Sequence, residues 1–176
     1  LKITEPRVLI KGDWKSPGES VEPGFLKILM RKSADHWLSK NNKMEGLGNW
    51  ITDTVNGSGE LLARVIVNRL WHHHFGQGLV ETPNDFGEIG SDPTHPELLD
   101  WLSTQLIENN WKLGHVHKLI LKSATYRQQN SSSSKYMDID SENRLLWHKK
   151  PQRLEAETIR DRILDAAGVL TKEIYG

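Results

Sequence analysis

Apolar side chains at helical spacing after residue 57 constrain the fold of this chain more than any other feature of its sequence. Between Ser58 and Gly76 they recur at about every third or fourth position, the spacing of a helix that buries one face. Serine often caps the start of a helix, and glycine often follows its end. The pattern therefore predicts a helix that begins after Ser58 and ends before Gly76.

Three later segments show the same period. Pro96 suits the first turn of a helix, and the apolar pattern after it runs to the Asn109–Asn110 pair. The other two segments are residues 114–124 and 152–167. Residues 82–87 contain proline and glycine and are expected to form a loop, and residues 131–134 form a polar, flexible tract. No strand pattern of comparable quality follows residue 58.

Residues 1–57 are less regular, with frequent proline and glycine. They leave room for a short strand at Val8–Ile10, a surface loop at Trp37–Lys43 and a short helix around Gly48–Val55. We therefore predict a mainly α fold, with a single domain of about four packed helices and long ordered loops over residues 58–176, after an irregular lead-in over residues 1–57. Because the chain starts at Leu1 and ends abruptly, we expect a piece of a longer protein, truncated at the C-terminal end of the helical domain.

Composition narrows the classes of function. Lysine plus arginine and aspartate plus glutamate each number 23, so the chain has no net field to recruit nucleic acid. No apolar run reaches the roughly 18 to 20 residues that span a bilayer. The chain has no cysteine, which excludes disulfides and thiolate metal sites but leaves the cellular compartment open.

Several ordered blocks together resemble one family. They are Arg64–Trp71, His73–Val80, Thr82–Gly87 and His95–Leu102, followed by Ser123–Gln128, Asn143–Trp147 and Arg153–Asp161, with a weaker block at Gly12–Gly24. In this order they resemble the C-terminal domain of unknown function of planctomycete-type cytochrome-c-associated proteins. The resemblance implies a large exported protein in the periplasm or at the cell surface, with a haem-c-like segment and a second uncharacterised domain upstream. Since the haem attachment pattern Cys-x-x-Cys-His is absent here, we expect no cofactor in this chain, and any haem c would be bound upstream. The resemblance carries no catalytic residues.

The three histidines His72–His74 invite a metal interpretation. Successive side chains on a helix point about 100° apart, so the three cannot converge on one ion. His115 and His117 would point to nearly opposite sides of a helix, which also disfavours joint ligation. We expect structural roles for these rings and no metal site.

The candidates for a catalytic centre are four residues around the 82–87 loop: His73, Asp85, His95 and Asp100. Two carboxylates in a cleft could act as acid and base in hydrolysis of a glycosidic or similar bond. The alternative, which we favour, is that Asp85 and Asp100 join Arg64, Asn68 and Arg69 in ion-pair and capping networks that fix the loop against its neighbours.

The chain contains seven tryptophans, a high number. Those in apolar helical contexts are expected in the core, namely Trp71, Trp101 and Trp111. Those in the irregular lead-in are expected to be exposed and are candidates for stacking on a sugar ring or a protein partner, namely Trp14, Trp37 and Trp50.

Two hypotheses of function follow. The first is a non-catalytic scaffold or binding module of a larger exported, cytochrome-associated protein, whose partners are other domains of the same longer chain, a polysaccharide or another protein. The second is a hydrolytic or metal-assisted enzyme centred on the four His and Asp residues. Whether the chain is an enzyme is left open by the sequence.

Overall fold

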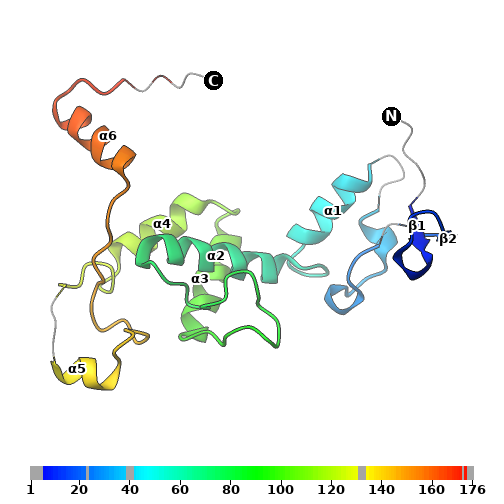
Figure 1. Cartoon of the computed structure of the whole chain (residues 1–176), viewed down its shortest axis with the longest axis horizontal. Coiled ribbons are helices and arrows are strands. Elements are labelled where there is room, and N and C mark those ends of the chain that lie inside the picture. The colour runs from blue at the N-terminus through cyan, green and yellow to red at the C-terminus, as the bar shows by residue number, and fades with distance from the viewer. Residues whose placement is uncertain (1–5, 23, 39–41, 131–133, 172, 174–176) are drawn as a thin grey trace. The chain divides into compact units, whose positions relative to one another are not determined.

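The computed structural model describes residues 6–22, 24–38, 42–130, 134–171 and 173 (Figure 1). The predicted mainly α class is confirmed, with six α-helices in the described ranges where about four were expected. These helices are α1 Lys43–Thr52, α2 Gly59–Phe75, α3 Pro96–Glu108, α4 Leu113–Lys122, α5 Ser134–Ile139 and α6 Ala156–Ala166. The chain divides into two compact units, one of residues 1–67 and 100–111 and the other of residues 68–99 and 112–176. We call them unit 1 and unit 2.

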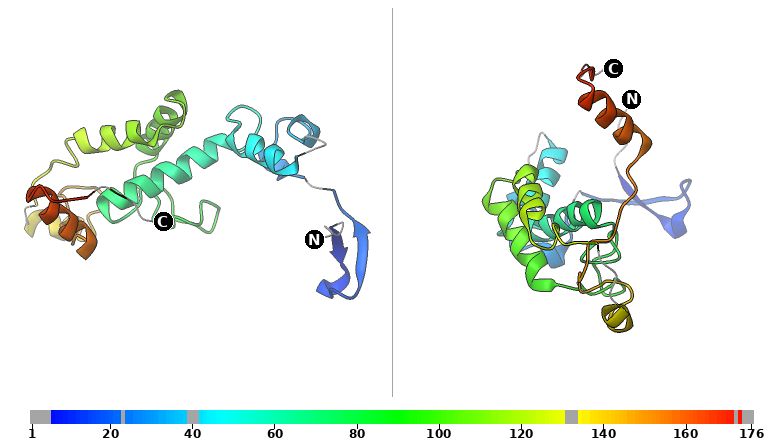
Figure 2. Two further views of the ribbon diagram at one scale, coloured as in Figure 1. Left: turned by 90° about the horizontal axis from the view of Figure 1, so that it is seen from above. Right: turned by 90° about the vertical axis from the view of Figure 1, so that its left-hand side faces the viewer.

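Unit 1 begins with a short hairpin of β1 (Arg7–Leu9) and β2 (Pro17–Ser20), visible in the left view of Figure 2. The strands are antiparallel, and their register shifts between the pairs Arg7–Ser20 and Leu9–Pro17. The predicted strand near Val8 is confirmed, but its partner contains proline and glycine and gave no strand signal. The 3₁₀ turns of unit 1 are η1 Ile10–Gly12, η2 Lys27–Leu29 and η3 Ala34–His36. No residue of either strand is buried.

An aromatic cluster organises the rest of the lead-in. The ring of Phe25 stacks on that of Trp50, with centroids 5.1 Å apart, and meets that of Trp37 edge-on at 5.7 Å. The carboxylate of Asp53 accepts the indole N–H of Trp37 at 3.0 Å. Two segments separated in sequence are thereby held together.

Helix α1 overlaps the helix predicted at 48–55, but it starts five residues earlier and ends three residues earlier. It starts at Lys43 because the side chain of Asn42 caps it, accepting the backbone N–H of Glu45 at 3.2 Å. It ends at Thr52 because the Asp53 carboxylate accepts the backbone N–H groups of Val55 and Asn56, which turns the chain. Both boundaries depend on short polar side chains.

Helix α2 confirms the strongest sequence pattern. Its buried side chains recur every four residues, at Ala63, Val67, Trp71 and Phe75. Ser58 precedes it as predicted, but through its carbonyl, which accepts the N–H of Leu62, while its hydroxyl has no hydrogen-bond partner among the described residues. Helices α3 and α4 lie within two residues of their predicted ranges.

The last third of the chain differs most from expectation. Helix α5 was not predicted, and of the predicted flexible tract only Ser134 is described, as the first residue of α5. Helix α6 starts four residues later than expected and has no buried residue. Its apolar side chains Ile159 and Ile163 are 44% and 63% exposed, so the expected packing of this face into the core is not seen. No described helix is long and apolar enough to cross a membrane.

Candidate functional site

One of the four proposed catalytic residues, Asp100, lies in unit 1. Its carboxylate is ion-paired with the guanidinium of Arg64. The pair lines an open polar groove of about 330 Å³, formed by Glu60, Arg64, Asp100, Ser103, Thr104 and Ile107. This ion pair is one of the structural contacts that we favoured over an acid–base role for Asp100.

The other three residues, His73, Asp85 and His95, lie in unit 2. The Asp85 carboxylate accepts the backbone N–H of Gly87 at 2.9 Å, and the His95 Nδ1 lies 3.0 Å from the hydroxyl of Thr94. His73 is exposed, with its ring edge-on to that of His72. Within the described part of the chain, none of these three side chains bonds another. The contacts of Asp85 and His95 are those of a folded loop, and His73 lies on α2.

The structural network that we favoured over an acid–base pair is present in part. The buried amide of Asn68 forms two hydrogen bonds to Val80, one to its carbonyl and one from its N–H, each 2.9 Å long. The guanidinium of Arg69 donates to the Asn84 side chain at 3.3 Å. All three bonds attach the C-terminal part of α2 to the connector that follows it. Asp85 contributes to the loop by a local turn, and no ion pair of its carboxylate is seen among the described residues.

In the described ranges, no three His, Asp or Glu side chains gather closely enough to hold a metal ion. Two histidine rings, those of His74 on α2 and His117 on α4, lie in contact. The His74 Nε2 and the His117 Nδ1 are 2.7 Å apart, so one ring donates a hydrogen bond to the other.

The tryptophans divide differently from the prediction. Trp14 is 75% exposed, as expected, but Trp37 and Trp50 are buried, because Phe25 packs on both. Trp71 is buried as predicted, whereas Trp101 is 49% exposed and does not belong to the core. Of the three candidates for stacking on a ligand, only Trp14 presents its ring to solvent.

The most unusual chemistry of unit 2 lies at the C-terminal end of α2. The Lys149 ammonium donates a hydrogen bond to the His74 carbonyl and lies over the rings of Phe75 and Tyr126, 4.7 and 4.8 Å from their centroids. A cation is favourable there, because the last carbonyls of a helix carry partial negative charge. Lys149 thus fastens residues 143–150 to α2.

Burial perturbs both basic groups of this cluster. It is the main cause that lowers the pKa of His74, and the positive charges of His117, Lys149 and His73 lower it further. Burial also lowers the pKa of Lys149. Both shifts disfavour the charged forms, as expected where several basic groups share a half-buried site.

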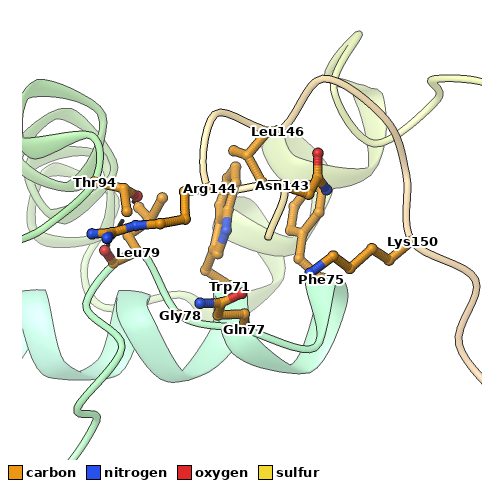
Figure 3. Close-up of a pocket in the computed structure, with 10 residues that line it drawn as sticks. All are labelled: Trp71, Phe75, Gln77, Gly78, Leu79, Thr94, Asn143, Arg144, Leu146 and Lys150. Carbon is orange, nitrogen blue, oxygen red and sulfur yellow. Dashed lines mark hydrogen bonds between the residues drawn. The ribbon is translucent and has the colours of Figure 1, made fainter. Parts of the chain in front are cut away.

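Beside this cluster is a pocket of about 20 Å³ (Figure 3). Its floor includes the stacked rings of Trp71 and Phe75, whose centroids are 4.2 Å apart. Figure 3 shows the Arg144 side chain reaching toward Thr94 on one side and the Lys150 side chain directed at Phe75 on the other. The full lining is Trp71, Phe75, Gln77, Gly78, Leu79, Thr94, Asn143, Arg144, Leu146 and Lys150.

A folded loop holds the cationic side of the pocket. The Asp140 carboxylate accepts the backbone N–H groups of Arg144 and Leu145, at 2.9 and 2.8 Å. The buried side chain of Asn143 bonds the carbonyl and the N–H of His148, at 2.9 and 3.2 Å. Asn143 has a φ of 59° and Leu146 a φ of 57°, a backbone conformation that costs energy in residues other than glycine. The surrounding hydrogen bonds maintain it.

Sequence reasoning missed this site. One signal was available, because residues 143–153 contain four lysine or arginine side chains and no acidic one. The meeting of His74 with His117 had no local signal, because 43 residues separate them in the chain.

Comparisons with known proteins support one family. The family model described as PSD1, protein of unknown function (DUF1553), matches residues 43–176. No curated protein and no solved structure matches the chain. Since the matched region covers well over half of the sequence, the chain belongs to the PSD1 (DUF1553) family, a family of unknown function.

Proposed function

We propose that this chain is a non-catalytic scaffold or binding module of a larger exported, cytochrome-associated protein, and that it docks other domains of the same longer chain. Its location is then extracytoplasmic, and any haem c is bound upstream. The resemblance of the sequence blocks to planctomycete-type proteins supports this assignment of context.

The observation that carries the proposal is helix α6. It has 11 residues, none of them buried. An isolated helix of this length is marginal in water, and most helical stability comes from packing of an apolar face. Ile159 and Ile163 are four residues apart and therefore lie on one face, largely exposed. This face is suited to a partner surface.

The β1–β2 hairpin supports the same conclusion independently. Its strands have three and four residues, and an isolated two-stranded hairpin is marginally stable at best. Three apolar side chains on and beside it are about half exposed or more: Val8, Ile10 and Trp14. Trp14 is in addition the exposed candidate for stacking on a polysaccharide.

An enzyme centred on His73, Asp85, His95 and Asp100 is the alternative hypothesis. No described contact favours it, because Asp85 and His95 bond residues near them in the chain and Asp100 pairs with Arg64. In the described ranges, no hydrogen bond or ion pair joins any two of the four side chains. A binding role therefore explains the exposed apolar side chains of α6 and of the hairpin, which the enzyme hypothesis does not explain.

Hydrogen exchange tests the proposal. The amides of residues 156–166 should exchange much more slowly in the longer protein than in this 176-residue chain. Ile163→Asn should abolish the difference, whereas Asp161→Asn, on the opposite face of α6, should preserve it. Equal exchange in the longer protein and in the shorter chain would refute docking through α6.

A further inference from the structure

The pocket of about 20 Å³ at the C-terminal end of α2 is lined by cationic side chains, and its properties do not depend on whether α6 docks. Two of its lining side chains are cationic, Arg144 and Lys150, and none of its lining residues is acidic. A third cation, Lys149, lies over the ring of Phe75, which forms part of the pocket floor. The field inside the pocket is therefore positive.

The carboxylate of Asp140, which feels the charges of Arg144 and Lys150, bonds the backbone of the loop. The Asp140 carboxylate accepts the backbone N–H groups of Arg144 and Leu145, and the charges of Lys150 and Arg144 help to lower its pKa. It does not line the pocket. Within the described chain, the Arg144 guanidinium makes no hydrogen bond, although it carries five N–H donors.

The size of the pocket limits the ligand. A volume of about 20 Å³ accommodates one water-sized group or slightly more, since one water needs roughly 10 to 15 Å³ on this measure. A sugar ring is too large, and it could not stack on Trp71, which is 3% exposed. One oxygen of a carboxylate fits this space, and the negative charge of the group suits the cations around it.

The loop that contains Arg144 is held in one conformation by its own hydrogen bonds, as a preformed binding site requires. Asn143 and Leu146, on either side of Arg144, hold left-handed backbone conformations that the Asn143–His148 and Asp140 hydrogen bonds maintain. A rigid loop loses little conformational entropy when a ligand binds. Arginine is also the residue best suited to carboxylates, because its planar fork donates two parallel N–H bonds.

We propose that this pocket binds a carboxylate group, with Arg144 as its principal donor and Lys150 as a second positive charge at the rim. The side-chain amide of Gln77 lines the same space and offers a further donor, whereas the Thr94 hydroxyl, which also lines it, donates to the Leu79 carbonyl. The carboxylate belongs either to a small acidic ligand or to an acidic side chain elsewhere in the longer protein. The chemistry of recognition is the same for both sources.

Acetate and acetamide, which are nearly equal in shape and differ in charge, provide the first test. In NMR titrations of the 176-residue chain, acetate should shift the indole N–H signal of Trp71, whereas acetamide should not. Arg144→Gln should weaken acetate binding about tenfold or more, since a hydrogen bond to a charged group contributes roughly 1.5 to 3 kcal/mol.

Arg153→Gln is the matched control, because it removes the same charge from an exposed arginine that does not line the pocket. It should leave acetate binding unchanged. Equal shifts with acetate and acetamide, or equal weakening in the Arg144→Gln and Arg153→Gln proteins, would overturn the proposal.

The longer protein distinguishes the two sources. If acetate still shifts the Trp71 signal there, the ligand is a free small carboxylate. If it does not, and the same protein without its flanking domains responds, an acidic side chain of the longer protein fills the pocket. Neither result depends on whether α6 becomes protected, so failure of the docking proposal would leave this test intact.

Discussion

Removal of the Asn68 side-chain amide should destabilise unit 2 strongly. Asn68 is fully buried, and Val80, whose backbone it bonds twice, is 2% exposed. In Asn68→Ala the N–H and the carbonyl of Val80 lose these partners. An unsatisfied buried polar group costs about 1 to 3 kcal/mol, so the pair should lower the free energy of unfolding by about 2 to 6 kcal/mol. That is a large part of the roughly 5 to 15 kcal/mol that a domain usually has.

Urea unfolding followed by circular dichroism measures this loss, and hydrogen exchange at the Val80 amide locates it. Asn84→Ala is the control, because Asn84 makes a single exposed hydrogen bond with Arg69 and its loss should change stability by no more than about 0.5 kcal/mol. A loss below about 1 kcal/mol in Asn68→Ala, or one equal to that of the control, would contradict the reasoning from burial.

Three further predictions concern packing and pH. Gly46→Ala should destabilise α1, because its Cβ would lie 2.7 Å from the Trp37 carbonyl oxygen. The Cβ of Gly48→Ala would meet nothing within 4 Å, so this change should stabilise α1 by up to about 1 kcal/mol. Urea unfolding in which both changes had the same sign would contradict this reasoning. Hydrogen bonds, above all from the Asn56 N–H, lower the pKa of Asp53 from 3.8 to about 2, so its stabilising contribution should be complete above pH 3.8 and disappear as the pH falls toward 2. Unfolding measured across this range should show a smaller loss for Asp53→Asn, and an unchanged loss would refute the assignment. Burial lowers the pKa of His74 below 6.5, so the contribution of neutral His74 to the free energy of unfolding should be complete above pH 6.5 and decline as the pH falls below it. In unfolding measurements across this range, the His74→Gln protein should show a weaker decline than the His72→Gln protein.

Local patterns explain which parts of the fold could be predicted. The period of the α2 residues Ala63, Val67 and Trp71 is a property of one helix, and Pro96 and the Asn109–Asn110 pair bound another. Each signal lies within a few residues of the structure that it predicts. The boundaries of α1 were missed, because they depend on two capping side chains whose contacts outweigh a weak apolar pattern.

The contacts of the proposed catalytic residues, and the exposure of the tryptophans, could not be predicted from local patterns. The four residues chosen as a catalytic centre were adjacent to one loop in sequence, yet the contacts of Asp85 and His95 are with their own neighbours. The expectation that Trp37 and Trp50 are exposed was wrong, because nothing near them in sequence shows that Phe25 packs on both. Position in an irregular segment does not indicate exposure.

By itself, the sequence determined the mainly α class, the course of α2, α3 and α4, and the membership of a family of unknown function. These properties follow from side chains that act on their own segment or match a pattern position by position. Only the tertiary structure decided which polar groups meet, such as Lys149 with the carbonyl of His74, 75 residues away. The reason is physical, because a hydrogen bond or a cation–π contact needs atoms within a few ångströms, and packing of the whole unit sets that distance.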